Sequence, residues 1–177
     1  MTRVCLVGED GINLQYELLS RETAREALMA YELREPFDNS VAVDTVSLGA
    51  AVALLNDLQW YLVRFVDEAL VFEPSVSETE WLSRGIATKI RESEIAPDES
   101  GRFLKIYGVV SKEASTDGSA DNAEEHESAM ESPPQLVEPM FVARTGEALP
   151  RYDLQDVDET IRVRVTETEF EQSTSPV

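Results

Sequence analysis

The sequence predicts a single α+β domain, in which a mainly antiparallel sheet carries about three helices on one face. Short runs rich in β-branched residues recur between turn residues, and three other stretches repeat apolar residues at helical spacing. The last strand-like run, "TIRVRVTE", alternates Ile161, Val163 and Val165 with polar residues, which is typical of a sheet with one solvent-facing side. The alternative is an α/β arrangement with the first strand at its centre.

The first predicted elements are a strand and a helix. "RVCLV", Arg3 to Val7, is a short apolar run that ends at "GEDG" and predicts a buried strand. "NLQYELL", 13–19, predicts either a second strand or the lead-in to a helix. From Ser20, "SRETAREALMAYEL" places apolar residues on one face, with Ser20 as N-cap and Glu22 in the first turn, and so predicts a helix.

The next segment predicts a strand, a helix and a hairpin. "SVAVDTV", 40–46, is strand-like, and Ser47 is positioned to cap a helix through "LGAAVALLN". "QWYLVRFV" and "ALVFEP" are rich in aromatic and β-branched residues and are divided by Asp67 and Glu68, a natural turn pair. Residues 59–73 are therefore predicted to form a hairpin.

A third helix and two more strands complete the predicted domain. "SETEWLSRGIATKIRE" opens with a capping box formed by Ser77 and Glu80. Its apolar stripe consists of Leu82, Ile86 and Ile90. "RFLKIYGVV", ending at Val110, and "LVEPMFVAR", starting at Leu136, predict strands that precede the final alternating run.

An acidic segment separates these last strands. Ser111 to Gln135 contains no Leu, Ile, Val or aromatic residue and carries seven acids against one lysine. Such a segment lacks the apolar residues that offset ordering entropy, so it is predicted to be a disordered insertion within a hairpin. The alternative is a tail for a basic partner. The end of the chain, 171–177, is also predicted to be disordered, which leaves 1–110 and 136–170 as the domain.

The charge composition indicates a salt-rich cytosol. The chain has 35 acidic against 15 basic residues, a formal net charge of -20, and only three lysines. Dense carboxylates stay hydrated where molar salt screens their repulsion, so we expect the fold to depend on salt. The charge argues against nucleic acid as a partner, although acidic nucleic-acid-binding proteins are normal in such a cytosol.

The sequence predicts a cytoplasmic protein without a membrane segment, metal or cofactor. The first apolar run is too short for a signal peptide, and no stretch of about 20 apolar residues is present. Cys5 is the only cysteine and is predicted to be buried and unreactive, while the only histidine, His126, lies in the acidic insertion. No catalytic set can therefore be assembled. The acidic run 153–159 does not match a calcium-binding loop.

Five residues are candidates for ligand binding. Gly8 and Gly11 follow the first strand, where backbone amides can hold phosphate, although two acids lie between them. Arg64 is predicted to lie in a strand, and Arg162 and Arg164 share one face of another. Such arginines can grip a carboxylate or phosphate in a bidentate manner. The alternative is that they pair with carboxylates of neighbouring strands.

Several segments resemble one uncharacterised family. The runs "MTRVCLVGEDGINLQYELLSRETAREAL", "LLNDLQWYLVRF", "EWLSRGIATKIRE" and "YDLQDVDETIRVRVTE" are similar to a domain-of-unknown-function family of halophilic archaea. The resemblance implies no activity, cofactor or site residue. With no catalytic set in view, the leading hypothesis is a non-enzymatic interaction or regulatory module with a protein partner. The alternative is a protein or enzyme that binds a small anionic ligand.

Overall fold

The computed structural model describes residues 1–110, 133–144 and 159–174. The strands are β1 (Thr2–Gly8), β2 (Ser40–Thr45), β3 (Val66–Phe72), β4 (Trp81–Ser83), β5 (Phe103–Val110), β6 (Gln135–Ala143) and β7 (Glu159–Val165). The helices are α1 (Leu14–Leu19), α2 (Glu22–Leu28), α3 (Leu48–Asp57), α4 (Gln59–Phe65), α5 (Arg84–Arg91) and α6 (Glu167–Thr174), with a short 3-10 helix, η1 (Pro97–Glu99).

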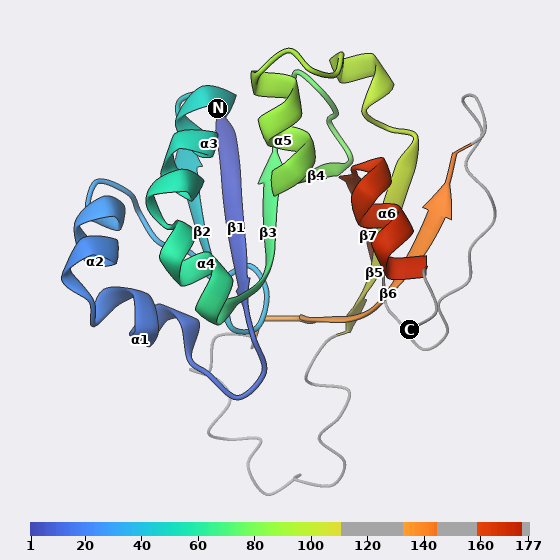
Figure 1. Cartoon of the computed structure of the whole chain (residues 1–177). Coiled ribbons are helices and arrows are strands. Elements are labelled where there is room, and N and C mark those ends of the chain that lie inside the picture. The colour runs from blue at the N-terminus through green and yellow to red at the C-terminus, as the bar shows by residue number, and fades with distance from the viewer. Residues whose placement is uncertain (111–132, 145–158, 175–177) are drawn as a thin grey trace, which may run out of the picture.

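The seven strands form one sheet in the order β2-β1-β3-β4-β7-β5-β6 (Figure 1). All neighbouring strands are antiparallel except β4 and β7, which run parallel. The prediction of a mainly antiparallel sheet is therefore confirmed. The β5–β6 pair is antiparallel, as expected for the two strands that flank the acidic segment.

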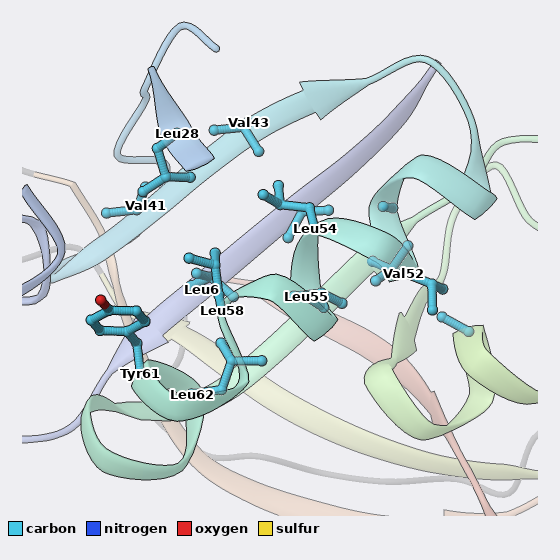
Figure 2. Close-up of a cluster of buried hydrophobic side chains, with 14 of the residues drawn as sticks. Leu6, Leu28, Val41, Val43, Val52, Leu54, Leu55, Leu58, Tyr61 and Leu62 are labelled. Carbon is cyan, nitrogen blue, oxygen red and sulfur yellow. The ribbon is translucent and has the colours of Figure 1, made fainter. Parts of the chain in front are cut away.

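The main core lies between one face of the sheet and helices α1 to α5. Figure 2 shows its centre, where leucines of α3 and α4 point toward the strands. The labelled strand residues are Leu6, Val41 and Val43, and the helix residues include Leu54, Leu55 and Leu62. Burial of these side chains stabilises the fold by about 1.5 to 3 kcal/mol each.

The opposite face carries a smaller core covered by α6. Cys5, Leu70 and Val163 are fully buried there, and Phe170 of α6 packs against this cluster. The ring centroids of Phe170 and Phe103 lie 4.8 Å apart. Helices therefore pack on both faces, which corrects the prediction of about three helices on one face.

Helix α4 replaces the first strand of the predicted hairpin. Leu58, Tyr61, Leu62 and Phe65 recur at helical spacing, and the first three of these side chains are buried. Packing of this stripe against the core outweighs the β-propensity of "QWYLVRF". Strand β3 then begins at Val66, so Asp67 and Glu68 lie within a strand rather than in a turn.

Two other helices begin later than predicted. The helix predicted from Ser20 is α2, which begins at Glu22 after Arg21 and ends at Leu28. Ser20 is not its N-cap but the C-cap of α1, which ends at Leu19. The stretch 13–19 is thus helical, one of its two predicted alternatives. Helix α5 is capped by Ser83, whose hydroxyl accepts a hydrogen bond from the Ile86 amide at 3.2 Å. Residues before it form β4, because Leu82 pairs with Val71 in the sheet.

The predicted insertion and tail lie mostly beyond what the structure describes. Of the predicted insertion, only 133–135 is described, and Gln135 is the first residue of β6. At the other end, α6 extends to Thr174, so the predicted tail begins within a helix. His126 and the acidic residues at 153, 156 and 158 lie outside the described residues.

Candidate functional site

A buried carboxylate lies where β4 and β7 meet. Glu80 directly precedes β4, and its side chain is 4% exposed. The parallel pairing of the two strands places Trp81 opposite Val163 and Leu82 opposite Arg164. Because side chains alternate along β7, Arg162 and Arg164 project to the face that Glu80 occupies. The sheet register therefore brings the carboxylate and these arginines together.

Three arginines surround Glu80 and form what we call the arginine cluster. Arg144, which follows β6, donates from Nη2 to Oε2 of Glu80 at 2.5 Å. Arg164 donates from Nε to Oε1 at 2.8 Å. Arg162 donates from Nη1 to Oε2 at 3.4 Å and remains 37% exposed. Carboxylate pairing, expected as the alternative for Arg162 and Arg164, is thus present.

The arginines keep Glu80 ionised. Burial by itself would raise the pKa of this carboxyl, but the hydrogen bonds from Arg164 and Arg144 and their charges together hold it below its ordinary value of 4.5. Each of the three guanidinium groups carries one positive charge at any physiological pH. The cluster therefore has two more positive charges than negative ones.

One donor of the cluster has no acceptor. Nε of Arg144 is buried and makes no hydrogen bond to the described part of the chain. Leaving such a donor without a partner costs about 1 to 3 kcal/mol. Nη1 of Arg164 is better satisfied, since it donates to Oγ of Ser100 at 2.9 Å and to the Pro97 carbonyl at 3.3 Å. The unmatched donor identifies Arg144 as the side chain best placed to receive an acceptor.

Arg144 and Arg164 line a cavity of about 810 Å³ between α5, η1 and the start of α6, which we call the arginine cavity. Both guanidinium groups approach Gly101: a Cβ at this residue would lie 2.8 Å from Nη1 of Arg144 and 3.2 Å from Cζ of Arg164. A side chain at this residue would displace the guanidinium group of Arg144 from its present position. The apolar residues Ile86, Ile95, Phe103 and Val165 also belong to the lining of the cavity.

The first turn of α6 borders the same cavity. Thr166 caps this helix: its hydroxyl accepts from the Glu169 amide at 3.1 Å, and the Glu169 carboxylate accepts from the Thr166 amide at 3.0 Å. Thr166, Glu167 and Thr168 all line the cavity. The carboxylates of Glu167 and Glu169 in this turn offset the positive end of the helix dipole.

Gly8 and Gly11 lie in a different cavity, of about 390 Å³, whose lining contains no arginine or lysine among the residues that the structure describes. We call it the acidic cavity, because five carboxylates line it: Asp10, Glu35, Asp38, Asp67 and Glu68. Glu68 is paired with Lys105 at 2.5 Å and accepts from the Tyr107 hydroxyl at 2.6 Å. Burial, followed by the charge of Glu68, raises the pKa of Tyr107. The structure therefore separates the glycine pair from Arg162 and Arg164.

Arg64 lies at neither cavity. It is on the outer side of α4, where its guanidinium stacks 3.9 Å from the centre of the Trp60 ring. The strand predicted for Arg64 is thus a helix.

Cys5 is fully buried in the sheet, and burial raises the pKa of its thiol to about 12. Within the described residues, no three acidic, histidine or cysteine side chains converge as a metal site.

A model of a family of unknown function, DUF5804, matches residues 2–109. The chain belongs to the DUF5804 family. The matched segment contains Glu80, α5 and Gly101, whereas Arg144, Arg162 and Arg164 lie beyond it. No curated protein and no solved structure matches the chain. Among the described helices of this DUF5804 member, none has the length and apolar character needed to cross a membrane.

The sequence indicated only part of this site. Arg162 and Arg164 stand out by their spacing on β7, but Glu80 appears in the sequence as the acid of a capping box. Ser77 does accept the Glu80 amide at 3.0 Å, yet the carboxylate turns to the arginines. Arg144 has no local signal beyond its position after a strand, since its contact with Glu80 joins residues 64 positions apart.

Proposed function

We propose that this DUF5804 protein binds a small anionic ligand in the arginine cavity, with Arg144 and Arg164 holding the anion. The observation that carries the proposal is the buried Nε of Arg144, a donor without an acceptor, at a cluster with two surplus positive charges. Guanidinium groups are well suited to bidentate binding of carboxylates and phosphates. No catalytic group is assigned to the cavity, so the proposed role is binding.

The proposal predicts site-specific binding of a simple anion. Sulfate, titrated at constant ionic strength against chloride, should move the NMR signals of the Arg144 and Arg164 Nε–H groups in a saturable manner. A dissociation constant on the order of 1 mM, or about -4 kcal/mol, is expected for so small an anion. Arg144→Lys and Arg164→Lys, which keep the charge but lose the planar fork, should each weaken binding about tenfold.

The control is Arg25→Lys, an exposed position on α2 away from the cavity, which should leave sulfate binding unchanged. Gly101→Ala gives a second test. It keeps every charge but crowds both guanidinium groups, so it should also weaken sulfate binding. Two results would show that the cavity is not an anion site: equal shifts of all arginine signals on addition of sulfate, or wild-type affinity for sulfate in both Arg144→Lys and Arg164→Lys.

A second candidate function is contact with a protein partner through α4. Trp60 is 46% exposed and Val63 is 65% exposed on the same side of this helix. The guanidinium groups of Arg64 and Arg21 lie 3.9 and 5.3 Å from the Trp60 ring. Exposed tryptophan next to arginine is typical of binding hot spots. The two arginines favour a partner segment that combines carboxylates with an apolar anchor.

Co-purification from native cells at molar potassium chloride tests this second function. Wild-type protein should retain an acidic partner in stoichiometric amount, and Trp60→Ala should lose it, because the largest apolar contact is removed. Glu26→Gln, at an exposed position on α2, is the control and should retain it. If Trp60→Ala keeps the same partner in the same amount, α4 is not the contact surface.

We further propose a salt-rich cytoplasm of a halophilic archaeon as the setting in which the protein works. The net charge of -20 and the presence of only three lysines support this setting.

A further inference from the structure

We infer that the anion bound in the arginine cavity is the dianion of a phosphomonoester with a small apolar body. This inference rests on the proposed anion site and adds the class of its ligand. It follows from three properties of the cavity: the charge at its inner end, the arrangement of donors there, and the apolar side chains on its wall.

The inner end of the cavity matches a double negative charge. Arg144 and Arg164, which line the cavity, are only 17% and 12% exposed, and together with Arg162, which lies outside its lining, they contact the single carboxylate of Glu80. Three positive charges against one negative charge leave a surplus of two. A carboxylate ligand would neutralise half of this surplus, whereas a phosphomonoester above its second pKa, near 6, would neutralise all of it.

The rim carries charges of both signs in contact with water. Its groups are Lys89 of α5, Asp98 and Glu99 of η1, Arg102, and Glu167 of α6, all of them exposed. Exposed charges of opposite sign contribute little to affinity because water screens them. The buried arginines therefore dominate recognition of the anion.

The donors converge from several directions, as a tetrahedral anion requires. Nε of Arg144 has no acceptor among the described residues, and Arg164 lines the same cavity. Thr166 and Thr168, at the start of α6, lie on another wall of the cavity. A planar carboxylate has two oxygens and can satisfy one guanidinium fork, while a phosphate has three oxygens to share between two.

The rest of the wall favours an apolar body on the ligand. Ile95 and Phe103 line the cavity and are only partly buried, whereas Ile86 and Val165, also in its lining, are buried in the two cores. A volume of about 810 Å³ exceeds what a bare phosphate occupies. Each methylene or ring carbon placed against these side chains adds to the affinity by removing apolar surface from water.

Three probes that share one phenyl body test the inference: phenyl phosphate, phenyl sulfate and benzoate, titrated by calorimetry at pH 7.5 and pH 5. At pH 7.5, phenyl phosphate should bind at least about tenfold more tightly than the two monoanions, because it carries a second charge next to partly buried guanidinium groups. At pH 5 it becomes a monoanion, and its advantage should fall to about threefold or less.

Glu80 keeps its charge across this range, because its pKa lies below its ordinary value of 4.5. Phenyl sulfate keeps one charge at both pH values, so it reports any change in the protein itself. Phenyl phosphate should also bind about fivefold more tightly than inorganic phosphate, in keeping with the apolar wall.

The outcomes separate the two proposals. Equal binding of all three probes at pH 7.5, or a preference for phenyl phosphate that is unchanged at pH 5, overturns the phosphomonoester inference and leaves the anion site intact. If none of the three moves the Nε–H signals of Arg144 and Arg164, the anion site itself is wrong. Arg164→Lys should reduce the preference for phenyl phosphate, and Arg25→Lys should leave it unchanged.

Discussion

Replacing Glu80 with glutamine should lower the free energy of unfolding by about 3 kcal/mol, because it leaves three converging arginines without their counter-charge. Arg144 and Arg164 are largely buried, so water cannot take over the role of the carboxylate. A loss of this size corresponds to a fall in melting temperature of about 6 to 12 °C for a chain of this length. Urea unfolding in about 1 M potassium chloride measures it, since urea leaves the ionic strength unchanged.

Glu78→Gln provides the matched control. It changes the net charge by the same amount two residues earlier, at an exposed side chain, and should alter the stability by less than about 0.5 kcal/mol. If Glu80→Gln and Glu78→Gln lower the free energy of unfolding equally, the effect is one of net charge, and the arginine cluster does not stabilise the fold.

The contribution of Glu80 should disappear in acid. Its pKa is lower in the folded protein than in the unfolded chain, so the folded state favours the ionised form. The stabilisation is then fully present above the unfolded pKa of about 4.3 and is lost as the pH falls through the lower, folded value. The difference in stability between wild type and Glu80→Gln should therefore be constant from pH 7 to pH 5 and shrink below pH 4.

Local sequence patterns predicted most of the sheet but not all of the helices. Strands β1, β2, β5 and β7 follow from runs whose propensity and periodicity agree, and α3 follows from Ser47 and an apolar stripe. Helix α4 does not, because its aromatic and β-branched residues favour a strand locally. The decision between the two rests on the packing of Tyr61 and Leu62 against distant strands, which a local pattern does not contain.

The site was less accessible to sequence reasoning for a related reason. The alternation on β7 places Arg162 and Arg164 on one face, but nothing in a single sequence states that β4 lies beside β7. That adjacency brings Glu80 to Arg162 and Arg164. The same absence of long-range information led the glycine pair at Gly8 to be grouped with arginines, although the fold places it in the acidic cavity.

The acidic cavity gives the expected salt dependence a location in the structure. Five described carboxylates line it, one of which, Glu68, is paired with Lys105, and the repulsion among them opposes folding. At an ionic strength of about 0.01 M the repulsion extends over roughly 30 Å, whereas at about 1 M it is screened within roughly 3 Å. The melting temperature of the wild type should therefore rise by about 10 °C or more between these conditions.

The double variant Asp10→Asn with Asp67→Asn tests whether the cavity is the source of this dependence. Removing two of the five charges should raise the melting temperature at low salt by several degrees and leave it nearly unchanged at about 1 M, where the repulsion is already screened. Glu26→Gln with Glu94→Gln removes the same charge from exposed positions outside the cavity. Equal gains in both double variants would assign the salt dependence to net charge, and a melting temperature that does not respond to salt would contradict the salt-rich setting itself.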